Sequence, residues 1–390
     1  MATTVSTPNK YHKKRFRWLD VKEHIMGYLF ILPAVVIITM FGLFPIGYAF
    51  YMSMHHWRVR QGDFIGLANY TKALGDDYIG LLLFIGGFAL LMIAYLVWTS
   101  GFKSISNGKL VARLTSLVVL ATGFYSISIG WGRIFEAGDT RFLDALPITF
   151  YYSLGTVPAE IAIALVLAYI LFQKIRGQEF FRMLYFLPYI TPVVATAVVF
   201  RTIFSPRDVS LANQAVALIG KGPFKWLFES KPFNVVFFEL ENLEGFLAGP
   251  SMALVSIIFF GIWTYIGYNT VIFLAGLGSI PSDLYEAAEI DGAGGWQKFR
   301  HVTLPLLSPV TFYLALVAFI GTFKAFNHIF VMRVPSALGT VDTTSIAIFD
   351  TFYKMNQFGY AAAQAFILFI IILALTFAQN KIFGERVFYG

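Results

Sequence analysis

The feature that most limits the fold of this 390-residue chain is a series of apolar segments that recur along nearly its whole length. A helix that crosses a bilayer needs about 20 apolar residues. The segments that reach this length are 25–54, 78–100, 110–131, 146–172, 183–204, 250–276, 310–331 and 360–383. Hydrophobic residues make up 57% of the chain and charged residues 13%, which is more apolar surface than a soluble domain can bury. We therefore predict an all-α polytopic membrane protein with about eight transmembrane helices.

Charge at the N-terminus predicts how these helices are oriented. A cluster of Lys and Arg between Lys10 and Lys22 precedes the first segment, and such clusters stay in the cytoplasm far more often than they bind nucleic acid. The first segment is uncharged over thirty residues and no small-residue cleavage site follows it, so we expect an uncleaved helix. An even number of spans places both termini on the cytoplasmic side. The predicted parts are a basic N-terminus at 1–24, a membrane domain at 25–383 with an external loop at 205–249 and a cytoplasmic loop at 277–309, and a cytoplasmic tail at 384–390.

Four prolines lie inside predicted spans: Pro33, Pro45, Pro188 and Pro192. Proline lacks a backbone donor, so neighbouring helices must satisfy the carbonyl that it leaves free. We expect a kink at each of them.

The cytoplasmic loop carries the most specific pattern in the chain. It reads Glu286-Ala287-Ala288, then Gly292, then Leu304-Pro305. We expect residues 283–290 to form a short helix capped by Ser282, Gly292 to end it, and a second helix to begin at Trp296. The two alanines leave one face thin enough for a partner's backbone to approach, and Glu286 offers a charge there.

This spacing resembles the coupling loop of importer permeases driven by ATP-binding-cassette (ABC) ATPases, and only Val302 departs from it, where Ile is usual. Further stretches resemble the maltose and glycerol-3-phosphate type of sugar permease, although Asn327 stands where Asp is more usual. These stretches are 64–70, 180–188, 321–327, 343–345 and 358–361. The resemblance covers about 25–75 and 140–385.

The resemblance implies a permease subunit that imports a sugar, oligosaccharide or related polyol across a prokaryotic plasma membrane. Its implied partners are a second permease, a cytoplasmic ABC ATPase dimer and an extracytoplasmic binding protein. The residues that would couple this chain to the ATPase are Glu286, Ala287, Ala288, Asp291, Gly292, Leu304 and Pro305. Two other classes of protein stay open: a secondary transporter driven by an ion gradient, and a membrane scaffold or receptor that transports nothing.

The chain lacks the residues that other functions need. It contains no Gly-rich phosphate-binding motif of the Walker A type, so the ATP would be hydrolysed by the partner ATPase. It has no Cys, and its six His show no metal-ligand spacing. We therefore predict no enzyme activity, no bound cofactor and no metal in this chain.

Two regions depart from a plain six-helix permease. Residues 78–131 add a helical hairpin to a six-helix core, and two added spans keep the downstream orientation. The loop at 205–249 either contacts a binding protein or forms a solvated cap.

Polar and aromatic residues inside predicted spans are candidates for the substrate pathway. A charge at the centre of a spanning helix costs about 2.5–3.5 kcal/mol on insertion scales, so Glu160 needs a reason to lie there. It either faces a water-filled path, or it snorkels towards the membrane surface or makes a hydrogen bond between helices. The other candidates, for which lipid contact or helix packing is the alternative, are Trp263, Tyr268, Asn269, Phe326 and Asn327.

Overall fold

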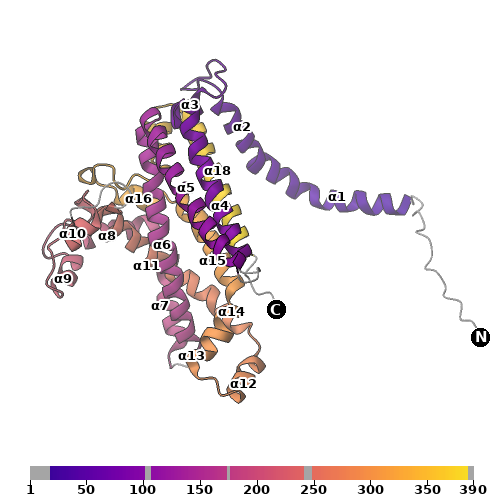
Figure 1. The fold of residues 1–390 in the computed structure, drawn as a ribbon, viewed down its shortest axis with the longest axis vertical. Coiled ribbons are helices and arrows are strands. Elements are labelled where there is room, and N and C mark those ends of the chain that lie inside the picture. The colour runs from indigo at the N-terminus through magenta and orange to yellow at the C-terminus, as the bar shows by residue number, and fades with distance from the viewer. Residues whose placement is uncertain (1–17, 102–106, 174–175, 241–247, 385–390) are drawn as a thin grey trace, which may run out of the picture. The chain divides into compact units, whose positions relative to one another are not determined.

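A computed structural model describes residues 18–101, 107–173, 176–240 and 248–384 (Figure 1). Over these ranges the chain is largely helical and contains isolated β-bridges but no β-strand. Six of the described helices are long and apolar enough to cross a membrane, and the number rises to eight if each of two bent helix pairs is one span. The predicted all-α polytopic class is confirmed. The basic cluster before Trp18, the acidic Glu241 and Glu244 of the predicted external loop, and the tail after Gly384 lie outside the described residues.

The chain divides into two units, residues 1–52 and 53–390. In the first, α1 (Trp18–Ile38) passes through a π-helical turn at Thr39–Leu43 into α2 (Phe44–Ser53). Pro45 lies just after that turn, where the wider π spacing accommodates a residue without a backbone donor. From His24 onwards these helices form an apolar segment that is long enough to cross a membrane.

The second unit begins with α3 (Ala68–Leu74) and a hairpin of α4 (Tyr78–Gly101) and α5 (Asn107–Ala137). Glycines bring the two hairpin helices into backbone contact. A Cβ atom added to Gly130 would lie 2.5 Å from the backbone nitrogen of Phe84. Small residues at such crossings allow close van der Waals packing, which is the main force between helices in lipid.

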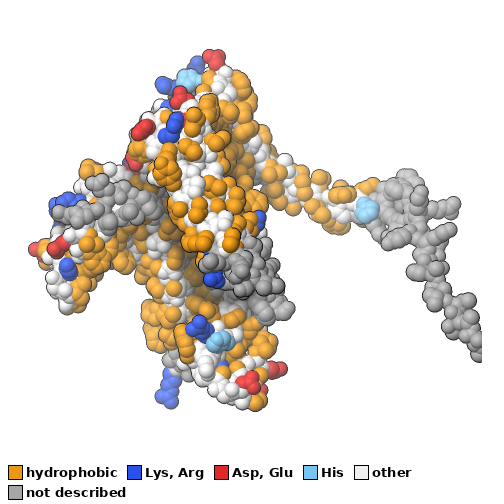
Figure 2. All heavy atoms as spheres, viewed as in Figure 1, with side chains coloured by type: hydrophobic (Ala, Val, Ile, Leu, Met, Phe, Trp, Pro, Cys, Tyr) orange, Lys and Arg blue, Asp and Glu red, His pale blue; other side chains and the backbone are white. Residues whose placement is uncertain are grey.

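The core of the second unit forms around α6 (Thr140–Phe172) and α11 (Met252–Gly278), with α7 (Gln178–Ile190), α15 (Ser308–Phe323) and α18 (Phe358–Phe383) beside them (Figure 1). Fully buried rings from several of these helices fill the interior, among them Tyr152, Phe260 and Phe273. Hydrophobic side chains cover the sides of this unit in Figure 2, and charged ones lie mainly towards its ends and on the arm with α9 and α10.

Two predicted spans are broken. The segment 183–204 is divided between α7 and α8 (Val193–Ile203), which meet at 96°. Thr191 is extended there because the ring of Pro192 excludes the helical conformation of the residue before it. The segment 310–331 ends as a helix at Phe323, and α16 (Asn327–Met332) follows a non-helical Phe326.

The segment after α8 is folded. It contains α9 (Leu211–Ala217), a 3₁₀ turn at Trp226–Phe228 and α10 (Phe233–Phe238). The buried amide of Asn213 organises it: Nδ2 donates to the carbonyl oxygens of Arg207 and Phe224, and Oδ1 accepts from Nε1 of Trp226 at 2.7 Å. Near the C-terminus, α17 (Thr344–Phe349) leads through a π-helical turn at Asp350–Lys354 to α18.

Candidate functional sites: a coupling loop and a buried polar seam

The short helix predicted in the cytoplasmic loop is present as α12 (Ser282–Ile290). The predicted cap by Ser282 is wrong. Pro281 occupies the capping position, so Ser282 already lies in the first turn, and its hydroxyl donates to Asp283 at 3.4 Å instead. Proline's fixed φ begins the helix one residue early.

Gly292 ends this helix by adopting a left-handed conformation with φ of +78°. The N–H of Gly292 donates to the carbonyl of Glu289, and the N–H of Ala293 donates to that of Ala288 at 2.9 Å. Glycine is the residue most often found in such a turn because it has no Cβ atom. The second helix, α13 (Gly295–Lys298), begins one residue before the predicted Trp296.

Side-chain contacts brace the loop internally. The Tyr285 hydroxyl lies 3.0 Å from the Thr303 hydroxyl, which joins α12 to the π-helical turn at Phe299–Thr303. Glu289 and Lys298 form an ion pair between α12 and α13. The ring of Phe299 lies 4.8 Å from that of Tyr169, measured between centroids, so the loop also contacts α6. The loop then continues through α14 (Leu304–Leu306) into α15.

The loop presents a polar and apolar surface at the end of the second unit opposite α3 (Figure 1). The predicted coupling residues are exposed in this chain, except Ala288, which is half-buried: Glu286, Ala287, Asp291, Gly292, Leu304 and Pro305. Ile290 is 87% exposed and Trp296 70% exposed. Sequence reasoning did not single out these two as contact residues; with Leu284 and Leu304, which are also exposed, they add large apolar side chains to a loop that carries charges as well.

A row of polar side chains, here called the polar seam, is buried along α6. It consists of Thr149, Ser153, Thr156 and Glu160. Their spacing of four, three and four places them on one helix face. The Thr149 hydroxyl lies 2.8 Å from that of Thr344, and the Ser153 hydroxyl lies 2.7 Å from that of Thr322. The seam therefore attaches α6 to α15 and α17 by polar contacts.

Glu160 and Asn269, both predicted pathway residues, meet within the subunit. They are 2% and 3% exposed, and their side chains lie near each other between α6 and α11. Glu160 Oε2 and Asn269 Nδ2 have no hydrogen-bond partner in the described part of the chain.

The other predicted pathway residues occupy two places. On α11, Trp263 is 37% exposed and the half-buried Tyr268 stacks on Tyr189 of α7, with 4.8 Å between ring centroids. Phe326 instead packs against Phe349 at 4.8 Å, next to the exposed Asn327. Between these two places, the ring of Phe260 lies 6.1 Å from that of Trp263 and 5.3 Å from that of His328, measured between centroids.

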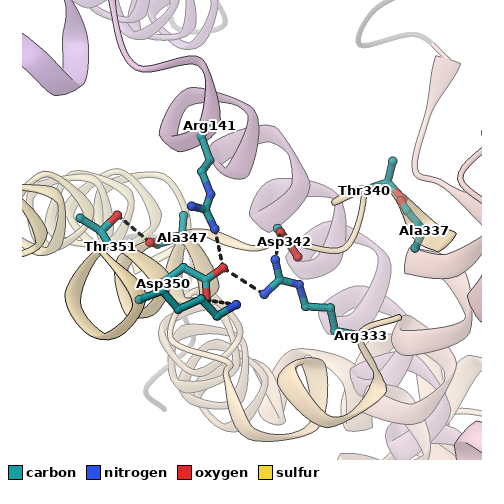
Figure 3. Close-up of polar contacts among 9 residues, drawn as sticks. Arg141, Arg333, Ala337, Thr340, Asp342, Ala347, Asp350 and Thr351 are labelled. Atoms are coloured by element: carbon teal, nitrogen blue, oxygen red, sulfur yellow. Dashed lines mark hydrogen bonds and ion pairs between the residues drawn. The ribbon is translucent and has the colours of Figure 1, made fainter. Parts of the chain in front are cut away.

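An ion-pair cluster that the sequence did not predict joins the start of α6 to residues 333–354 (Figure 3). Asp350 is fully buried and binds Arg141, Arg333 at 3.0 Å and Lys354 at 2.8 Å. Arg333 also binds Asp342 at 2.5 Å. Burial raises the pKa of Asp350, but hydrogen bonds from Lys354 and Arg333 outweigh it and hold that pKa below its usual value.

The fold is similar to a solved ABC transporter chain. In the crystal structure of a bacterial alginate ABC transporter, in complex with a periplasmic protein bound to alginate pentasaccharide, one chain matches with a TM-score of 0.60 at 17% identity. The match covers 93% of this chain and 96% of the other.

Curated relatives are sugar permeases. The arabinooligosaccharides transport system permease protein AraP of Bacillus subtilis is 30% identical over 66% of this chain and 76% of its own length. The trehalose/maltose transport system permease protein MalF of Thermococcus litoralis is 23% identical over 93% of this chain and 95% of its own length. Residues 160–389 match the family described as binding-protein-dependent transport system inner membrane component. The chain therefore belongs to this family of inner membrane components, and its relatives are the permease subunits of ABC sugar importers.

Proposed function

We propose that this chain is the permease subunit of an ATP-driven importer for a sugar, oligosaccharide or related polyol delivered by an extracytoplasmic binding protein. A second permease completes the pathway, and a separate ABC ATPase dimer hydrolyses the ATP. The observation that carries the proposal is the braced, exposed loop around α12, because a chain that hydrolyses nothing itself needs a rigid surface on which an ATPase can act.

In this proposal α12 docks into a cleft of the ATPase. Glu286 meets a basic or donor group there, and the exposed Ile290 is buried against the partner. Movement of the ATPase passes from α12 to the following turn through Tyr285 and Thr303, and to α6 through Phe299 and its contact with Tyr169. A loop without these contacts would deform when the ATPase moves and would not pass that movement on to α6.

Two aromatic positions of α11, on different faces of the helix, are our candidates for the pathway surface. Trp263 and Tyr268 present rings on which sugar faces can pack. Glu160 and Asn269 are buried within the subunit and would meet a substrate only when α6 and α11 separate. Phe326 and Asn327 form a second candidate place beside Phe349.

The proposal also assigns the two sides of the membrane. With α12 in the cytoplasm of a prokaryotic cell, both termini are cytoplasmic. The end of the second unit that carries α3 is then extracytoplasmic (Figure 1).

The test is uptake into proteoliposomes that contain both permeases and the ATPase, supplied with the binding protein. We expect uptake that requires ATP and persists when proton and sodium gradients are collapsed. Uptake that follows an ion gradient without the ATPase would support a secondary transporter instead. Absence of uptake in a fully assembled complex would support a scaffold or receptor.

A further inference from the structure

An open pocket of about 240 Å³ lies at the end of the second unit opposite the coupling loop. Its walls come from the segment that leads into α3 and from the start of α18. It is lined by His56, Trp57, Arg58, Ile65, Ala68, Asn69, Lys72, Gln357 and Tyr360. Two of these residues are cations and none is acidic. Figure 2 shows Lys, Arg and His side chains at this end of the unit, together with acidic ones.

Hydrogen bonds hold the pocket walls in place. Asn69 is buried, and its Nδ2 donates to the carbonyl oxygens of Ser53 and His55 at 2.8 and 3.1 Å. The N–H of Gly359 donates to the carbonyl of Trp57 at 2.9 Å and so joins the two walls. The pocket is therefore a built feature and not a gap between mobile side chains.

The two cations make contacts other than ion pairs within the described part of the chain. Lys72 Nζ donates to Gln357 Oε1 at 2.8 Å and lies 3.9 Å from the centroid of the Tyr360 ring. Among the described residues, no carboxylate forms an ion pair with Arg58 or Lys72. Asp139, whose charge acts on Lys72, accepts a hydrogen bond from the Tyr360 hydroxyl at 2.6 Å and does not line the pocket.

Two cations that form no ion pair with a described carboxylate, beside an amide and an indole ring, favour an anionic occupant. The volume of the pocket indicates how large that occupant is. Pockets for small molecules have about 300–1,000 Å³, so this one is small for a saccharide and suits a single acidic side chain.

We infer that Arg58 and Lys72 receive a carboxylate side chain, Asp or Glu, of the extracytoplasmic binding protein. The inference rests on the proposed function, which places this end of the subunit on the side where that protein would dock. Charge pairs at a docking surface of this kind speed the association of the two proteins and fix the orientation in which they bind.

The experiment titrates the reconstituted importer with its binding protein and follows ATP hydrolysis. The test variant carries Arg58→Glu and Lys72→Glu. The matched control is Arg60→Glu, which reverses a charge in the same segment but outside the pocket. We expect the double variant to raise the half-saturating concentration of binding protein at least tenfold with an unchanged maximal rate, and the control to change it less than twofold. A second variant, Gln357→Glu, places a carboxylate next to Lys72 and should weaken binding in the same direction if the double variant fails to assemble.

Two results would overturn the inference. The first is a titration in which all three variants coincide with the unaltered chain. The second is a difference in the rate of ATP hydrolysis between the double variant and the unaltered chain that depends on the phosphatidylglycerol content of the vesicles and persists at saturating binding protein. That result would assign the pocket to a lipid headgroup. Both results leave the proposed function intact as long as the binding protein stimulates the unaltered complex. A lack of that stimulation would overturn the proposed function and this inference together.

Discussion

Gly292→Asp should weaken binding of the ATPase while leaving membrane insertion intact. A residue with a Cβ atom is strained in the left-handed conformation by about 1 kcal/mol or somewhat more, and less when its side chain is Asn or Asp. No atom lies within 4 Å of the position that the Cβ would take, so no steric clash adds to this strain. A new negative charge at the C-terminal end of α12 adds about 0.3–1 kcal/mol because it opposes the helix dipole.

Together these effects destabilise the turn by roughly 1–2 kcal/mol. If the free loop leaves the turn to escape this cost and must regain it on binding, the complex is weaker by up to about fivefold to thirtyfold, before any clash with the partner surface. The assay measures the affinity of the purified ATPase for vesicles that contain the permease. Gly292→Asn is the matched control, since it keeps the size of the side chain and tolerates the left-handed turn without the charge. If Gly292→Asp binds the ATPase as tightly as the unaltered chain and transports at the normal rate, our reasoning about this turn is wrong.

The remaining predictions concern stability and the hairpin. Gly130→Leu should force α4 and α5 apart, because its Cβ would lie 2.5 Å from the backbone of Phe84, whereas Gly132→Leu meets open space and should be tolerated; folded yield in detergent distinguishes them. Asp350→Asn should destabilise the chain by about 1.5–3 kcal/mol, since it removes the charge of a buried carboxylate that accepts hydrogen bonds from partly exposed cations; an unchanged temperature of thermal unfolding would show that the cluster is unimportant. The lowered pKa of Asp350 means that its contribution is present above the unfolded pKa of about 3.9 and is lost as pH falls through the lower folded value; Asp350→Asn should flatten that acid dependence. Replacing residues 78–131 by a short linker should reduce stability more than ATP-driven uptake per assembled complex, and complete loss of uptake in complexes that still hydrolyse ATP would place the hairpin in the pathway.

The membrane-spanning segments and the short helix of the cytoplasmic loop can be predicted from the sequence, because both depend on residues that are neighbours in the chain. The helix at 282–290 and the turn at Gly292 follow from local backbone preferences. The polar seam could also have been predicted, since Thr149, Ser153, Thr156 and Glu160 repeat at helical spacing. Of these four, the sequence analysis named only Glu160, because it is charged.

Features that depend on distant contacts were not predictable. Arg141 and Asp350 are 209 positions apart, and nothing local to either one indicates the other. The 96° break at Thr191 and Pro192 exceeds an ordinary proline kink, because both flanking helices pack against different neighbours. The end of α15 at Phe323 was missed for a similar reason: residues 324–331 are apolar enough to continue a span, and tertiary packing interrupts them.

The central claim is that α12 is the surface on which an ATPase acts, and site-specific cross-linking tests it most directly. The chain has no Cys, so Ala287→Cys provides a single attachment point for a photoreactive maleimide. Leu82→Cys, on the exposed surface of the hairpin, is the control. We predict that Ala287→Cys forms an adduct with the ATPase subunit and that Leu82→Cys does not. Complexes that transport and hydrolyse ATP, yet give no ATPase adduct from Ala287→Cys or give equal adducts from both positions, would contradict the account.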